Sequence, residues 1–328
     1  MKRSVLDQLV LEQRLNEPTA AMALDLSGAR PDAAAWRSFL VRLLNGAGIA
    51  ALGAGAIFFV AANWQDYGVL GRFALLQVAL LAAAGLALWR PPPHALGQGA
   101  VTLALLFTGA LLALFGQTYQ TGADVYELFF IWAALAFPFA LASASAAVWA
   151  TWWVVLNVGM ALYCGLEDTS LARFLFASRL GIERPLLLFL ACLVNLGGAI
   201  LFDHLGRARW LVRVLATFGF VFGTVACMVA LFGGSARGAG MSQQDSLVIL
   251  LFAAACGGIA FETLRRKRDV YPMALVFGAW IAISTAFLIK QMQFKDFGNV
   301  LVLAAWLIAT SGVAGFVLMK WVREWRAT

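Results

Sequence analysis

The sequence predicts an all-α polytopic membrane protein, a bundle of about ten transmembrane helices with a short N-terminal cytosolic helical arm. Two observations predict this class. The 328-residue chain is 62% hydrophobic and only 12% charged, whereas soluble domains contain about 45–50% apolar and about 25% charged residues. In addition, apolar segments of about 20 residues follow one another from Leu44 to Lys320, and about 20 helical residues cross the ~30 Å hydrocarbon core of a bilayer. Backbone groups in lipid must hydrogen-bond within their own segment, so these runs are expected to be helices.

Residues 1–42 form the predicted arm, and residues 43–328 form the membrane domain. Pro31 can begin a helix in the arm, with Asp32 in its first turn and Trp36, Phe39 and Leu40 on one side. Two interpretations of the arm remain open. It is either a cytosolic docking or regulatory module, or an amphipathic lead-in that lies along the membrane surface.

The ten predicted spans follow the arm in order. They are residues 44–62, 70–89, 96–115, 125–142, 147–165, 185–203, 211–232, 247–264, 271–289 and 298–320. The proline run at 91–93 ends the second span, because proline lacks the backbone donor that a helix needs. Only residues 143–146 separate the fourth and fifth spans, which predicts a tight hairpin. Merging or dropping one span there gives nine spans as the alternative.

The placement of lysine and arginine predicts the orientation. With the N-terminus inside, 17 of the 24 Lys and Arg residues fall on the cytoplasmic side, as the positive-inside rule requires. Ten spans then place both termini in the cytoplasm. The net charge of +7 is distributed in short clusters between apolar helices, a pattern typical of topology signals, so nucleic acid is not an expected partner.

Polar groups within the spans are few. Asn157 and Asn195 each lie near the middle of a predicted helix, and consecutive antiparallel helices can bring them to the same depth. They are interpreted as interhelical hydrogen-bond partners, with a substrate-contacting pair as the alternative. Asp, Glu, Lys and Arg are missing from the central part of every span, which weakens a proton-coupled mechanism. The paired glycines Gly219 and Gly223, like the glycines of the first span, indicate close helix packing.

No catalytic, metal or cofactor signature is present. The four cysteines lie in different predicted spans without CxxC spacing, and the two histidines fall in separate short loops. A membrane serine enzyme would need a base at its own depth, and none is found there. We therefore expect no enzyme activity, no metal and no cofactor.

Two polar stretches are predicted at the outer surface, after the first and third spans. The candidate binding residues there are Asn63, Trp64, Asp66, Gln117, Tyr119, Asp124 and Glu127. Beside helix C-termini, which carry partial negative charge, these groups form an electronegative mouth suited to a cation, an amine or a basic segment. Anchoring of aromatic residues at the membrane interface is the alternative.

These stretches also resemble a known family. The run Phe-Phe-Val-Ala-Ala-Asn-Trp at 58–64 is similar to its AaNW signature. Its second block is matched by Gly109-Ala110, Gln117-x-Tyr119, Gly122, Leu128-Phe129, Trp132 and Pro138. The family is the bacterial membrane group catalogued as domain of unknown function 2157. The resemblance implies a bacterial inner-membrane protein and supplies neither an activity nor catalytic residues.

Two functions remain open from the sequence. One is a transporter-like permease for a small solute, without an ion-coupling carboxylate at the midplane. The other is a non-transport scaffold, sensor or assembly factor that uses the arm and the outer polar loops. The expected partners are the lipid bilayer and either another protein or a small solute.

Overall fold

The computed structural model describes residues 19, 22, 32–62, 67–120, 122–143, 145–165, 184–236, 241–267, 269–292 and 297–327. It is 90% helical, and its described residues form no strand. Ten described helices are long and apolar enough to cross a membrane, which confirms the predicted fold class. In chain order the elements are α3 (Ala33–Ala62), α4 (Val69–Trp89), α5 (Ala95–Tyr119), α6 (Val125–Ala142), α7 (Ala146–Tyr163), α9 (Arg184–His204), α10 (Arg209–Ala236), α11 (Gln243–Glu262), the π-helical η1 (Thr263–Lys267), α12 (Val270–Gln291) and α13 (Phe297–Ala327).

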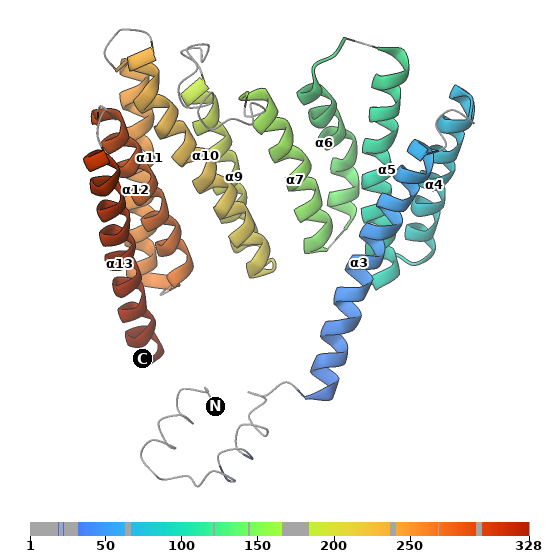
Figure 1. The fold of residues 1–328 in the computed structure, drawn as a ribbon. Helices are drawn as coiled ribbons and strands as arrows, with labels where there is room; N and C mark the ends of the chain where they lie inside the picture. The colour runs from blue at the N-terminus through green and yellow to red at the C-terminus, as the bar shows by residue number, and fades with distance from the viewer. Residues whose placement is uncertain are drawn as a thin grey trace.

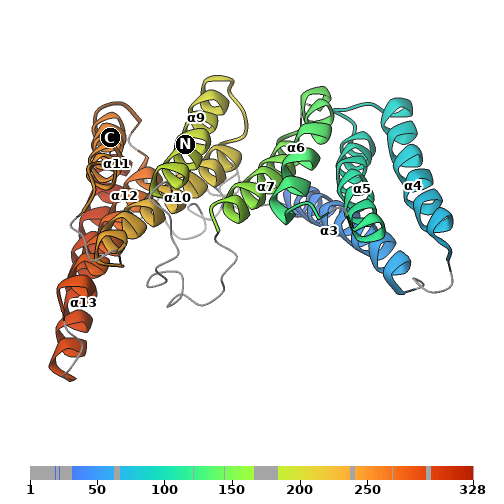
Figure 2. The ribbon, with the colours of Figure 1, turned by 90° about the horizontal axis from the view of Figure 1, so that it is seen from above.

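The helices stand side by side in a long row (Figure 1). Helices α3 to α7 form one half and α9 to α13 the other, and α7 lies next to α9 and α10 where the halves meet. Figure 2 shows α4 and α13 at opposite ends of this row, with α3 crossing α5. Helix α3 begins and α13 ends on the same side of the row, the lower side in Figure 1.

The helix ends follow local sequence signals. The proline run at 91–93 separates α4 from α5, and the side chain of His94 caps α5 by accepting a hydrogen bond from the Leu96 backbone at 3.2 Å. The predicted hairpin between α6 and α7 is present. Ser145 caps α7 by accepting from the Ala147 backbone at 3.3 Å, as serine does at helix N-termini.

Helices α3, α5, α10 and α13 all extend several residues beyond their predicted spans, and the extensions of α3 and α5 bear on the arm and on the candidate site. Helix α3 runs unbroken from Ala33 to Ala62, so the boundary drawn between the arm and the first span falls inside a helix. Its Asp32 side chain accepts from the Ala35 backbone at 2.6 Å. Helix α5 continues to Tyr119, so Gln117 and Tyr119 belong to its last turn and not to a loop.

Glycine allows close packing in α10. A Cβ at Gly219 would lie 2.8 Å from Leu196 of α9, and one at Gly223 would lie 2.1 Å from the Phe252 ring of α11. The predicted packing role of this pair is confirmed. The first-span glycines differ, because only Gly53 approaches another helix, where a Cβ would lie 3.2 Å from Leu106; Gly46, Gly48 and Gly55 would meet nothing within 4 Å.

Candidate functional site

A cavity of about 470 Å³ lies where the C-terminal end of α5 meets the N-terminal end of α6. This volume is within the range of small-molecule pockets, about 300–1,000 Å³. Apolar side chains, among them Phe115 and Leu128, form most of its lining. Its polar side chains are the two amides and two carboxyl groups of Gln117, Gln120, Asp124 and Glu127. Three of the predicted residues, Gln117, Asp124 and Glu127, are therefore gathered at one cavity.

The turn between the two helices shapes this cavity. Gln120 ends α5 in the left-handed region with φ 44°, and Gly122 follows with φ 67°. A residue in the left-handed region commonly ends an α-helix, although glutamine pays a steric cost there that glycine does not. This reversal places Gln120 on the lining, a role that the sequence analysis did not assign to it.

The cavity is acidic. Asp124 is the N-cap of α6 but makes no side-chain cap hydrogen bond, and Glu127 lies in the first turn. Among the described residues, no lysine, arginine or histidine lines the cavity. The partial positive charge of a helix N-terminus favours carboxylates at these positions. An apolar cavity with two carboxylates and two amides in its lining suits a ligand that carries a cationic group and an apolar portion.

Tyr119 is not part of this lining. Its ring packs on Phe115 at a centroid distance of 4.8 Å and on Phe73 of α4 at 6.2 Å, which fits the alternative of an interfacial aromatic belt. The remaining predicted residues, Asn63, Trp64 and Asp66, lie outside the described residues.

The two mid-membrane asparagines are hydrogen-bonded to each other. The Asn157 amide nitrogen donates to Asn195 Oδ1 at 3.0 Å, and the Asn195 amide nitrogen donates to Asn157 Oδ1 at 2.8 Å. Each amide also donates to the backbone carbonyl one turn before it, Asn157 to Trp153 at 2.8 Å and Asn195 to Ala191 at 2.9 Å. Both side chains are buried. The predicted contact is thus present, and it joins α7 to α9 across the meeting point of the two halves.

Two tryptophans extend this series of interhelical hydrogen bonds. Trp132 of α6 donates from Nε1 to the Leu105 carbonyl of α5 at 2.8 Å, and Trp152 of α7 donates from Nε1 to the Ala133 carbonyl of α6 at 2.8 Å. Gly109 makes the first of these possible, because a Cβ there would lie 2.3 Å from the Trp132 ring. Side-chain hydrogen bonds therefore connect α5, α6, α7 and α9 in sequence.

Metal-ligating side chains do not gather in the described part of the chain. No group of three or more His, Cys, Asp or Glu residues is found there with the proximity that a metal site needs. Cys164, Cys192 and Cys227 are buried and Cys256 is partly buried, all as free thiols.

Comparison with known proteins bears on the N-terminal half. No curated protein and no solved structure was found to match the chain. Residues 7–149 match the sequence profile of a family described as "Predicted membrane protein (DUF2157)". The matched range contains the whole α5–α6 cavity, Gly109 and Trp132, and it ends in the first turn of α7, before Asn157. Over residues 7–149 the chain is therefore similar to DUF2157, a family described as predicted membrane proteins.

Proposed function

We propose that this membrane protein is a sensor, and neither a permease nor an enzyme, that binds a small cationic ligand with an apolar portion in the α5–α6 cavity. The observation that carries the proposal is the composition of that cavity: an apolar hollow of about 470 Å³ whose charged side chains are both acidic, Asp124 and Glu127. A cationic headgroup at the two carboxylates makes charge-assisted hydrogen bonds or ion contacts. The apolar lining accommodates the rest of the ligand.

The midplane asparagines support a sensor over a permease. Secondary transporters typically hold their substrate near the bilayer midplane, at interrupted helices. Here the amide nitrogens of Asn157 and Asn195 donate to each other's side-chain oxygen and to backbone carbonyls. Helices α7 and α9 are also continuous at these positions. Neither asparagine lines the α5–α6 cavity.

The proposal extends to orientation. We place the protein in a bacterial inner membrane with both termini in the cytoplasm, which puts the cavity on the periplasmic side. The lysine and arginine bias supports this orientation. A reporter fused after Arg90 is expected to read cytoplasmic, and one fused after Gly165 periplasmic. The reverse result at both sites would invert the assignment.

The binding proposal is tested with butyltrimethylammonium, whose charge is permanent, against hexanoate as the anionic comparison. Purified protein in detergent is titrated by calorimetry. Saturable binding of the cation alone is expected. The Asp124→Asn and Glu127→Gln double variant should weaken it by about tenfold or more, ~1.4 kcal/mol, because the electrostatic attraction between the carboxylates and the quaternary ammonium is lost. Glu324→Gln, an exposed glutamate of α13, is the matched control and should bind as the wild type does.

Two outcomes would contradict the proposal. Equal binding by the double variant and the control would show that the cavity does not bind the cation. Saturable uptake of butyltrimethylammonium into proteoliposomes, abolished in the double variant, would show a permease and overturn the sensor.

A further inference from the structure

An apolar groove of about 290 Å³ runs between α10 and α12, away from the α5–α6 cavity. Every lining side chain except two threonines is apolar or absent. The lining residues are Thr217, Phe220, Val221, Thr224, Val225 and Met228 of α10, with Ala274, Leu275, Gly278 and Ala279 of α12.

The length of the groove corresponds to one leaflet of a bilayer. Thr217 and Met228, its two ends on α10, are 11 residues apart, which is about 16 Å of helix at 1.5 Å per residue. This is about half of the ~30 Å hydrocarbon thickness. The groove is open toward its surroundings, because Val221 is 52% exposed and a Cβ at Gly278 would meet nothing within 4 Å.

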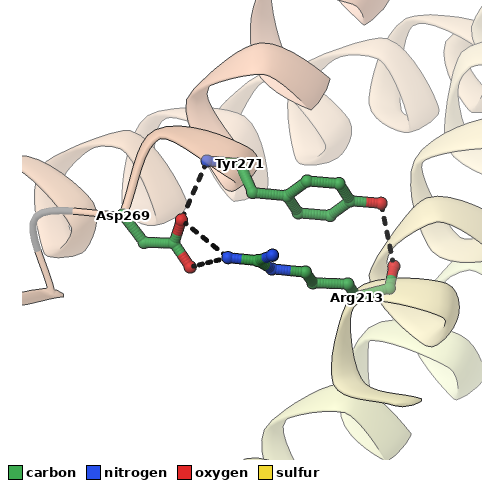
Figure 3. A network of polar contacts seen from close by, with 3 residues as sticks. All are labelled: Arg213, Asp269 and Tyr271. Atoms are coloured by element: carbon green, nitrogen blue, oxygen red, sulfur yellow. Dashed lines mark hydrogen bonds and ion pairs between the residues drawn. The ribbon is translucent and has the colours of Figure 1, made fainter. Parts of the chain in front are cut away.

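Arg213 lies near the end of the groove where α10 and α12 begin, and Figure 3 shows it between Asp269 and Tyr271. Arg213 lies one turn before Thr217, and its guanidinium lies over the Tyr271 ring at 5.0 Å. Asp269 holds it through Nη2, at 3.2 and 3.4 Å. The Tyr271 hydroxyl donates to the Arg213 carbonyl at 3.3 Å and is also in hydrogen-bond contact with the Thr217 hydroxyl, which lines the groove.

This arrangement leaves Arg213 able to bind an anion. A guanidinium has five N–H donors, and both contacts with Asp269 use Nη2 alone. The side chain is 47% exposed. Arginine forks match phosphate geometry, and long side chains near helix ends reach toward the headgroup region.

The connections at this end of the groove are basic. The segments 203–213 and 262–269, which join α9 to α10 and α11 to α12, together contain seven Lys or Arg and three Asp or Glu. In Figure 1 the described parts of both segments lie on the lower side of the row. Juxtamembrane clusters of this kind attract anionic lipid headgroups.

We propose that the α10–α12 groove binds one acyl chain of an anionic phospholipid whose phosphate is held by Arg213. The apolar lining, its one-leaflet length and the arginine at its interfacial end fit a single lipid molecule, tail and headgroup together. This site is separate from the α5–α6 cavity and does not rest on the sensor proposal.

Native mass spectrometry of the delipidated full chain tests this site with phosphatidylglycerol and phosphatidylcholine of identical acyl chains. The wild type should retain one phosphatidylglycerol more firmly than phosphatidylcholine. Gly278→Leu, which fills the groove, should reduce retention of both lipids by about tenfold. Arg213→Gln should remove the preference for phosphatidylglycerol by acting on the headgroup alone.

Each variant has a matched control. Gly312→Leu makes the same change on the exposed face of α13, where a Cβ also meets nothing within 4 Å, and Arg90→Gln removes an exposed arginine at the end of α4. Both should retain phosphatidylglycerol as the wild type does. Unchanged retention in Gly278→Leu, or equal lipid preference in Arg213→Gln and Arg90→Gln, would overturn the proposal. As a second measurement, a phosphatidylglycerol with a photoreactive acyl chain should crosslink to segments 217–228 and 274–279. Crosslinking elsewhere alone would also refute it.

Discussion

Replacing Asn157 or Asn195 by leucine should destabilise the protein by about 1–3 kcal/mol, because the remaining amide then stays buried without its partner. Two reciprocal hydrogen bonds join the pair, at 2.8 and 3.0 Å. Interhelical hydrogen bonds in membranes average ~0.6 and reach ~1.7 kcal/mol each, so the two together give a coupling energy of about 1–3 kcal/mol. Each amide also keeps a bond to its own helix, which limits the cost of losing the partner.

The assay is a double-mutant cycle with unfolding followed in mixed micelles. Because the double variant replaces both amides by apolar groups, its cost should be smaller than the sum of the two single costs. Asn157→Leu combined with Thr310→Val supplies the control. Thr310 bonds within α13 to the Trp306 carbonyl at 2.7 Å, and α13 does not pack on α7, so this pair should be additive. A coupling between Asn157 and Asn195 below about 0.5 kcal/mol, the usual error of additivity, would refute the reasoning.

Two further predictions concern helix packing at Gly109 and helix capping by Asp269. Gly109→Ala should cost about 1–3 kcal/mol in the same unfolding assay, since the new Cβ would displace Trp132; Gly116→Ala on the same helix, where a Cβ meets no atom within 4 Å, should be neutral or stabilising by up to ~1 kcal/mol. Equal effects at the two glycines would show that Trp132 is not tightly held. Asp269→Ala should cost about 1 kcal/mol because Asp269 caps α12 through the Tyr271 backbone at 3.0 Å. Asp269→Asn keeps a capping oxygen and should cost less, since exposed ion pairs contribute little; an equal cost would assign the effect to the ion pair.

The number and order of the helices were predictable because a bilayer imposes a length on every apolar segment. Helix ends marked by proline or serine, as at residues 91–93 and at Ser145, were found close to where they were expected. The end of α5 was misplaced because Gln120, and not glycine, takes the left-handed conformation that stops the helix. No local rule gives glutamine that role.

The candidate site was predictable only in its local part. Gln117, Asp124 and Glu127 flank one short turn, so their proximity follows from the sequence. Tertiary packing decides which other helix ends lie beside that turn. Hydropathy does not predict which transmembrane helices pack together. The Asn157–Asn195 contact was predictable because buried polar groups seek partners and antiparallel neighbours offer one at equal depth. Its position where the two halves of the row meet could not be predicted from the sequence.

The hydrogen-bonded series from α5 to α9 limits how a ligand in the cavity can act on the rest of the molecule. Ile131 lines the cavity and precedes Trp132, whose Nε1 ties α6 to α5. A ligand that separates the two helix ends therefore works against this bond within one turn of its own site. If the bond holds, α5 and α6 move together, and the Trp152 bond carries that motion to α7. The asparagine pair then transfers it to α9, because paired buried amides resist separation more strongly than apolar contacts do. A response confined to the cavity would require one of these three interhelical hydrogen bonds to break. Variants at Trp132, Trp152 or the asparagine pair therefore test the sensor proposal most directly.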